Sequence, residues 1–559
     1  MMNEMAHRRG LWRYASRWTL MIGALLIALF AGCGATPVET PSVPTSLPST
    51  STPTPVPFTF TPVPSPTVTA SPSPVPTATP ASPSPFAALP LEPSGHAAVM
   101  ISGAAQYLDA LQDAPRYQIT VSYDPDTLTL QGTQRVRMVN RSADSLGEAY
   151  FRLYPNGSSL HGPARLDLLG VMDDWGQPLL WQEDSDPSII RVELPEGWAP
   201  GAALLLNLTW TAQIPSDETR SWTREDGYGL FRQARGLTVL AEWFPMLAIY
   251  EGGSWRLDRV PDWGDPVYSE IAFYEVWVTA PKEHMVIGTG LEVSVSESSG
   301  TATRRFLSGP ARDFFLAFSP DLWVNSTTVG ETRVRSYAFP EHALGGATAL
   351  AASADALGVF NSRFGAYPYR ELDVLEAPLL GLLGMEYPGV ILLANTIYTP
   401  DQRWRLEITA AHEVSHQWWY GVVGNDILLE PWLDEALATW SSGLYVEMVN
   451  GRPEFVDQYD GWVERYESGQ RNGTVGAVTW PVERFRTSWD YVTTTYYKGA
   501  IALDALRREI GDSAFFGALR RHHAESRFDV ATGQRLLELF EQESGRDLDA
   551  FWRKWFFSE

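Results

Sequence analysis

The sequence predicts an α+β protein of several domains, in which an antiparallel β domain precedes a mostly helical domain. Three observations support this fold class. The 559 residues exceed the length of one ordinary domain. Short segments of alternating apolar and polar residues fill the first half of the chain after its tail. From about residue 326 onward, longer stretches take a helical period. We therefore place the β domain at residues 97–325 and the helical domain at residues 326–559.

The β domain is predicted from short segments rich in β-branched and aromatic residues. Their alternation is typical of half-buried strands in an antiparallel sheet. No repeat of 20–50 residues is evident, which argues against a propeller. The clearest predicted strands are 117–123, 134–139, 203–210 and 273–280.

The second half combines a few strands with several helices. An Ala- and Leu-rich segment predicts a helix that ends near Gly365 and Pro368. Further predicted elements are strands at 372–377 and 389–393, and helices at 347–364, 402–420, 432–449, 453–468 and 496–510.

The first 33 residues have the pattern of a secretory signal. Four arginines precede an apolar run from Leu20 to Phe30, which is short for a bilayer span. The sequence Phe30-Ala31-Gly32-Cys33 resembles a bacterial lipoprotein box, in which the cysteine carries lipid. Cys33 is the only cysteine, so an intramolecular disulfide is impossible. We therefore predict a cell-surface lipoprotein, held outside the cytoplasm on a bacterial membrane; an uncleaved anchor helix is the alternative.

Residues 34–96 are dominated by Pro, Ser and Thr. Such a segment cannot bury a core and is expected to remain a disordered, extended stalk. The net charge of the chain is −24. Charge of this sign argues against binding to nucleic acid and against electrostatic binding to anionic lipid headgroups.

A metal-binding pattern lies in the helical half. It reads His412-Glu413-Val414-Ser415-His416, and Glu435 follows after eighteen residues. Two histidines four residues apart share one face of a helix. With a later carboxylate they make the three-ligand set of a catalytic zinc site, one ion per chain. Glu413 is then placed to take a proton from a water molecule that the metal activates.

The residues around this pattern resemble the aminopeptidase N family of zinc peptidases, within the gluzincin group. The resemblance rests on His412 to Gly421 and on Pro431-Trp432-Leu433-Asp434-Glu435-Ala436, where the family usually has Asn-Glu-Gly at the last three positions. It implies that Glu435 is the third zinc ligand, in a thermolysin-like catalytic domain. It covers about residues 110–559. Large members continue into further domains, so we expect here a more open site with weaker control over substrate length.

Two further segments resemble motifs of the same family. Gly384-Met385-Glu386 resembles the element that pairs with the substrate as an added strand, and its Glu binds the free amino terminus. Thr495-Tyr496-Tyr497-Lys498-Gly499 resembles the segment whose tyrosine donates to the oxyanion. In this alignment the tyrosine that donates to the oxyanion is Tyr496, and Tyr497 is the neighbouring candidate.

Other residues give weaker signals. Glu242, in Ala241-Glu242-Trp243-Phe244-Pro245, is a candidate second ligand for the substrate amine, or else an interface carboxylate. The Gly264-Asp265-Pro266 segment is family-like, but we interpret it as architectural. His522 and His523 are adjacent, so on a helix they diverge by about 100° and cannot chelate one ion.

The resemblance implies a zinc aminopeptidase that acts on peptides with a free N-terminus, and the first 33 residues predict that it is tethered to a membrane. Two alternatives stay open at this point. A thermolysin-like endopeptidase would share the zinc ligands and lack the amine-binding residues. A cell-surface binding protein on a peptidase scaffold would need neither Glu413 nor Tyr496.

Overall fold

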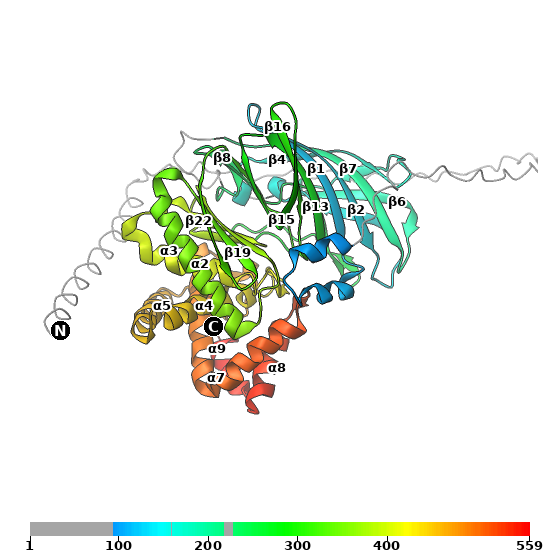
Figure 1. The fold of residues 1–559 in the computed structure, drawn as a ribbon. Coiled ribbons are helices and arrows are strands. Elements are labelled where there is room, and N and C mark those ends of the chain that lie inside the picture. The colour runs from blue at the N-terminus through cyan, green and yellow to red at the C-terminus, as the bar shows by residue number, and fades with distance from the viewer. Residues whose placement is uncertain (1–92, 158, 217–226, 559) are drawn as a thin grey trace, which may run out of the picture. The chain divides into compact units, whose positions relative to one another are not determined.

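The fold was examined in a computed structural model, which describes residues 93–157, 159–216 and 227–558. These residues fall within one compact unit. The predicted signal, Cys33 and nearly all of the predicted stalk lie outside the described residues. The elements discussed below are labelled in Figure 1.

The first half of the described chain is built from β-sheets. The largest sheet has seven strands in the order β15-β16-β13-β1-β2-β7-β4. All of its pairs are antiparallel except one, because β1 and β13 run parallel. These two strands are far apart in sequence, so a long crossover joins them. The strands of this sheet are β1 (Arg116–Asp124), β2 (Thr129–Val139), β4 (Arg165–Met172), β7 (Ala203–Gln213), β13 (Phe273–Pro281), β15 (Leu291–Glu297) and β16 (Thr301–Leu307).

Smaller sheets complete the β-rich half. Two have four strands each, in the orders β10-β3-β6-β5 and β14-β17-β9-β8, and β11 pairs with β12. Their bounds are β3 (Leu146–Arg152), β5 (Trp181–Glu183), β6 (Ile189–Trp198), β8 (Phe231–Ala234), β9 (Leu237–Leu240), β10 (Met246–Leu247), β11 (Tyr250–Glu251), β12 (Ser254–Trp255), β14 (Met285–Gly288) and β17 (Leu316–Ser319).

Side-chain alternation explains why these segments form strands. In β1, Ile119, Val121 and Tyr123 are buried, whereas Thr120 and Ser122 between them are exposed. The period of two places one face of the strand on the core. The four strands that the sequence predicts most clearly correspond to β1, β2, β7 and β13.

The second half packs helices on a five-stranded sheet with the order β18-β19-β20-β22-β21. Helices α2 and α3 lie against this sheet (Figure 1). The strand β21 is at the edge of the sheet and pairs only with β22 among the described strands. The sheet comprises β18 (Trp323–Val329), β19 (Thr332–Ala338), β20 (Glu371–Ala377), β21 (Gly384–Tyr387) and β22 (Val390–Ala394); β23 (Gly424–Asn425) and β24 (Val530–Ala531) pair separately.

The helical elements bury a large aromatic core. Trp418, Trp432 and Trp440 are almost completely buried there. The helices are α2 (Ala343–Phe364), α3 (Arg403–Ser415), α4 (Trp432–Val449), α5 (Arg452–Asn472), α6 (Ser488–Tyr491), α7 (Gly499–Glu525), α8 (Gly533–Ser544) and α9 (Asp549–Trp555), and the π-helical segment η11 (Val492–Lys498) lies between α6 and α7.

The predicted fold class, a β domain followed by a mostly helical domain, is confirmed, and some boundaries differ. The boundary predicted between residues 325 and 326 falls inside β18. Helix α3 ends at Ser415, earlier than the predicted residue 420, and Tyr420 has a φ of 118°, which no helix allows. Among the described residues, the segment Pro340–Phe364 is long and apolar enough to cross a bilayer. Half of that window is buried, as in a core helix, so it is weak support for a membrane span.

Candidate metal centre and substrate cavity

The three predicted metal ligands meet in one place. His412 and His416 lie at the end of α3, and Glu435 lies in the first turn of α4. The Nε2 atom of His412 is 3.2 Å from Nε2 of His416 and 3.2 Å from Oε2 of Glu435. The remaining separation, between His416 Nε2 and Glu435 Oε2, is 3.6 Å. Donors at about 2.0–2.1 Å from a tetrahedral Zn²⁺ are about 3.3 Å apart, so this triangle fits zinc.

The charge state of Glu435 suits a metal ligand. Burial alone would raise the pKa of Glu435, but its interactions with His412 and His416 outweigh burial and lower the pKa to about 2. A carboxylate that is ionised across the physiological range supplies the hard oxygen of a two-histidine, one-carboxylate set.

His416 is oriented by a carboxylate on the side away from the metal position. Its Nδ1 donates a hydrogen bond to Oδ1 of Asp434, which is fully buried. With Nδ1 protonated, the lone pair of Nε2 points toward His412 and Glu435. Such a carboxylate–histidine pair fixes the tautomer and the ring of a metal ligand.

Glu413 lies against the edge strand β21. A Cβ added to Gly384 would lie 2.2 Å from Oε1 of Glu413, so a larger residue here would have to displace this carboxylate. Burial, with the neighbouring carboxylates of Glu435 and Asp265, raises the pKa of Glu413, although His416 opposes the rise. A raised pKa is typical of a carboxyl group that exchanges protons during catalysis.

Tyr496 is the tyrosine that faces the metal ligands. Its hydroxyl donates to Oε1 of Glu435, and its ring stacks on that of His412 with centroids 5.9 Å apart. Burial and Glu435 raise the pKa of the Tyr496 phenol, which keeps it a hydrogen-bond donor. Tyr497 lines the same cavity, with the guanidinium of Arg465 over its ring. The π-helical segment η11 carries both, and such segments are frequent at functional sites.

Glu386 reaches the same cavity from β21, together with Met385 and Gly384. Its neighbour is Asp265, from the loop between β12 and β13. Oxygen atoms of Asp265, Glu386 and Glu435 all lie within 4.8 Å of one another. Burial raises the pKa of Glu386, and Asp265 raises it further. This part of the cavity therefore favours a cation.

The interpretation of Glu242 as a second amine ligand is not supported by its position. Glu242 is not among the described residues that line the cavity. It lies just after β9 with a φ of 48°, it is buried, and its Oε2 is 2.6 Å from Nε2 of His161. Its backbone turn directs the carboxylate to His161, so Glu242 belongs to the buried interior of the β-rich half.

Sequence reasoning missed Asp265 and the role of Asp434. The segment Gly264-Asp265-Pro266 was interpreted as architectural, yet Asp265 lines the cavity. A glycine and a proline on either side of one acidic residue were the available signal. The only signal for Asp434 was that the family usually has Asn at this position, next to the ligand Glu435.

The cavity around these groups has a volume of about 790 Å³. It is large enough for several residues of a peptide, since ligand pockets typically measure about 300–1,000 Å³. Tryptophans form part of its wall: Trp263, Trp404, Trp462 and Trp489.

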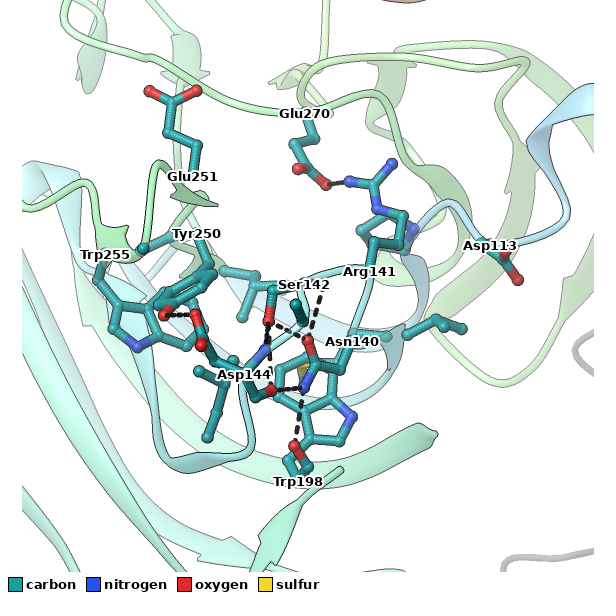
Figure 2. Close-up of a pocket in the computed structure, with 18 of the residues that line it drawn as sticks. Asp113, Asn140, Arg141, Ser142, Asp144, Trp198, Tyr250, Glu251, Trp255 and Glu270 are labelled. Atoms are coloured by element: carbon teal, nitrogen blue, oxygen red, sulfur yellow. Dashed lines mark hydrogen bonds and ion pairs between the residues drawn. The ribbon is translucent and has the colours of Figure 1, made fainter. Parts of the chain in front are cut away.

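A second cavity, of about 460 Å³, lies in the β-rich half and contains none of the metal-binding residues (Figure 2). Several of its polar groups bind one another. Arg141 pairs with Glu270, and the Tyr250 hydroxyl donates to Asp144 at 3.0 Å. The Asn140 amide donates to the carbonyl oxygens of Asp144 and Trp198. The chemistry of the chain is therefore assigned to the first cavity.

Comparisons with known proteins identify relatives of the chain. Residues 348–555 match the model of the peptidase family M1 domain. Aminopeptidase M1-B of Oryza sativa subsp. japonica is 25% identical over 313 residues, which cover 53% of this chain and 35% of that protein. Aminopeptidase N of Acetobacter pasteurianus is 28% identical over 337 residues, which cover 58% of this chain and 88% of the relative. The chain thus spans about a third of the length of the plant relatives it matches.

Solved structures share the fold. The M1 zinc metallopeptidase from Deinococcus radiodurans superposes with a TM-score of 0.60 and 19% sequence identity, over 80% of this chain and 93% of that chain. The match to the family model lies over the helical half, where the ligands, Glu413 and Tyr496 are found. The comparisons therefore support an aminopeptidase N-family zinc metallopeptidase, with the peptidase family M1 domain in the helical half.

Proposed function

We propose that this chain is a zinc aminopeptidase, which removes single residues from the free N-terminus of peptides. One observation carries the proposal. The three metal ligands and Glu386 line one cavity, and Glu386 reaches it from an edge strand beside Glu413. A peptide added to that edge as a further strand would bring its N-terminus to a carboxylate near the metal.

The chain's own residues divide the chemistry among them. Bound by His412, His416 and Glu435, zinc would supply a Lewis acid that polarises the scissile carbonyl and lowers the pKa of water. Glu413 takes a proton from the attacking water as the carbon–oxygen bond forms. It then delivers this proton to the amine that leaves when the carbon–nitrogen bond breaks. Tyr496, which donates to Glu435 in the free enzyme, donates to the carbonyl oxygen as negative charge develops there.

The relatives support an exopeptidase over an endopeptidase of thermolysin type. Curated proteins that match the chain are aminopeptidases. A mutant of the Deinococcus radiodurans enzyme was crystallised with a Tyr-Ser-Ala substrate. A buried carboxylate at the end of the substrate position favours a charged ammonium, because a blocked terminus would leave that carboxylate unpaired.

The test compares a short peptide with its N-acetylated copy. We expect the free peptide to be cleaved at its first bond and the acetylated copy to be cleaved at least about 100-fold more slowly, since a buried charge pair is lost. Mass spectrometry of the products identifies the bond. Equal rates, or cleavage at internal bonds, would support the endopeptidase instead.

A second comparison separates an enzyme from a non-catalytic binding protein. Purified chain should hold one zinc ion, and Glu413→Gln should keep that ion while it loses about 10²–10⁴-fold in rate. A wild-type protein that binds no zinc, or a Gln variant that cleaves as fast as the wild type, would refute the enzyme.

We also propose that the enzyme is tethered outside the cytoplasm through lipid on Cys33, with residues 34–96 as the stalk. The sequence of the first 33 residues supports this proposal, and they lie outside the described residues. Cys33→Ser should leave an unlipidated precursor that no longer fractionates with membranes. Unchanged size and unchanged membrane attachment would contradict it.

A further inference from the structure

We propose that Arg405 and Arg465 bind a carboxylate of the peptide substrate, at the part of the cavity away from Glu386. This carboxylate is the C-terminal group of a short peptide or an acidic side chain. The inference rests on the proposed aminopeptidase function and concerns the same cavity. It adds a substrate class, short or acidic peptides, to the removal of the first residue.

The cavity has an acidic part and a basic part. The carboxylates of Asp265, Glu386 and Glu435 gather in the acidic part, with oxygen atoms within 4.8 Å of one another. Arg405, from α3, and Arg465, from α5, are the cationic side chains of Arg or Lys among the described residues that line the cavity. A peptide carries the opposite charges, an ammonium at one end and a carboxylate at the other.

The two arginines lie close to one group, the phenol of Tyr497. The guanidinium of Arg465 is 5.4 Å from the centroid of the Tyr497 ring. Burial raises the pKa of the Tyr497 phenol, and the charges of Arg465 and Arg405 both oppose that rise. Two cations on neighbouring helices therefore approach the same part of the cavity wall, where one carboxylate can contact both.

No carboxylate of the described chain neutralises this pair. Neither Arg405 nor Arg465 forms an ion pair with a described Asp or Glu at 4.0 Å or less. One N–H group of Arg465 donates to the carbonyl oxygen of Gly461 at 2.9 Å, and the side chain of Arg405 has no hydrogen bond to a described residue. A guanidinium has five N–H donors, so most of them remain available to a ligand.

The order of residues along β21 and α3 gives the direction of a bound peptide. Glu386 lies beside His416 at the C-terminal end of α3, since oxygen and nitrogen atoms of the two fall within 4.8 Å. Gly384 lies against Glu413, which comes earlier in α3. A peptide that starts at Glu386 and follows β21 past Gly384 therefore runs toward the N-terminal end of α3, where Arg405 is found.

The distance along α3 indicates which residue of the peptide meets the arginines. Arg405 precedes the metal ligand His412 by seven residues. Seven residues are two helical turns, which place both on nearly the same face, about 10.5 Å apart along the axis. An extended peptide advances about 3.3–3.6 Å per residue, so the carboxylate lies about three residues beyond the cleaved bond. A tetrapeptide has its C-terminus at that position.

A packing role is the competing interpretation. Arg465 stacks on Tyr497, and such a contact is favourable without any ligand. Stacking uses the face of the guanidinium and leaves the N–H groups at its edge free to bind a carboxylate. Arg405 has no aromatic ring beneath it among the described cation–π contacts, and it is exposed. Packing therefore explains one arginine, whereas an anionic ligand explains both.

The experiment measures cleavage of matched peptides by the full zinc-loaded chain. Leu-Ala-Ala-Ala is compared with its C-terminal amide, and the released leucine is quantified. We expect kcat/KM for the acid to exceed that for the amide by roughly 3- to 10-fold, because solvent screens charges at an open cavity wall. The difference should lie in KM, and it should shrink as the ionic strength rises from about 0.01 M to about 1 M.

Two further substrate pairs identify the source of the carboxylate. The amides of Leu-Ala-Ala-Glu and Leu-Ala-Ala-Gln differ only in a side chain, so faster cleavage of the Glu peptide assigns the contact to acidic side chains. An eight-residue peptide and its amide should be cleaved equally, because the terminal carboxylate then lies beyond the arginines. A preference that persists in the eight-residue pair, or equal rates within every pair at low ionic strength, would overturn the proposal.

Variants separate a carboxylate contact from a structural role. Arg405→Gln and Arg465→Gln should each raise KM for the acid and leave the kinetics of the amide unchanged. Arg403→Gln is the matched control, because Arg403 is on the same helix, pairs with Glu407 and is not among the described residues that line the cavity. Equal losses on acid and amide would overturn the proposal in favour of packing. A wild type that releases leucine from none of the peptides would refute the aminopeptidase function itself, and this inference with it.

Discussion

Asp434 hydrogen-bonds the Nδ1 atom of His416, while the Nε2 atom of the same ring lies 3.2 Å from Nε2 of His412. The two nitrogens of one imidazole therefore have separate tasks. Nδ1 is held by a buried carboxylate, and Nε2 is presented to the metal. A negative charge behind the ligand also makes the ring a stronger donor to Zn²⁺.

The first prediction concerns that charge. Asp434→Asn keeps an acceptor for Nδ1 but removes the charge, so zinc affinity should fall by about 10-fold; Asp434→Ala, which also frees the ring, should lose up to about 100-fold. Competition with a zinc chelator of known affinity measures both. Affinities equal to that of the wild type would show that Asp434 does not orient the ligand.

The second prediction distinguishes the adjacent tyrosines. Tyr496→Phe should lower kcat by about 10²–10³-fold and leave KM nearly unchanged, because the hydroxyl acts on charge that develops after substrate binds. Tyr497→Phe is the matched control, since Tyr497 lines the cavity while Tyr496, within the described residues, is the tyrosine that hydrogen-bonds Glu435. A larger effect at Tyr497 would reverse the assignment.

The third prediction is acid sensitivity from the buried pair His522 and His523. Burial lowers the pKa of His522 to about 4 and that of His523 to about 3. In the unfolded chain both have a pKa near 6.5, so the unfolded state binds protons that the folded state refuses. Their contribution to stability is complete above pH 6.5. It is lost as the pH falls from 6.5 toward about 4 and then 3.

The loss for His522 alone is on the order of 3 kcal/mol over that range. His522→Leu should therefore reduce the slope of unfolding free energy against pH between 6.5 and 4, whatever its stability at neutral pH. Denaturant unfolding at several pH values measures the slope. A slope equal to that of the wild type would mean that His522 is already charged in the fold.

The sequence was sufficient to predict the parts of the site that depend on residues close together in the chain. His412 and His416 are one helical turn apart, and one turn of α3 brings their Nε2 atoms together. Glu435 lies in the first turn of the next helix and required only the family context. The alternation of apolar and polar residues in β1 likewise predicts which face of the strand is buried, without any tertiary information.

The contacts that could not be predicted from the sequence depend on packing between residues far apart in the chain. Asp265 and Glu386 are 121 residues apart, and only the docking of a loop from the β-rich half on the helical half brings them together. Arg312 is one of the residues that join these halves, since its guanidinium donates to the carbonyl oxygens of Tyr420 and Asp529. The surroundings of Glu242 could not be predicted from the sequence for the same reason. Its burial beside His161 is a property of the folded β-sheets.

The last prediction tests how closely the edge strand must approach the catalytic carboxylate. Gly384 begins β21, and a Cβ there would lie 2.2 Å from Oε1 and 2.5 Å from Cδ of Glu413. Gly384→Ala must therefore push the Glu413 side chain or the strand aside. A displacement of about 1 Å in a catalytic group can cost about 100-fold in rate, so kcat should fall by roughly 10- to 100-fold.

Gly147→Ala is the matched control, because Gly147 also lies in a strand and a Cβ there meets no atom within 4 Å. Steady-state kinetics, with zinc content measured on the same samples, separate the outcomes. Zinc should stay bound in both variants, because the ligands do not move. A Gly384→Ala enzyme with the kcat of the wild type would show that Glu413 can act from more than one position, and the close contact would then be a matter of packing alone.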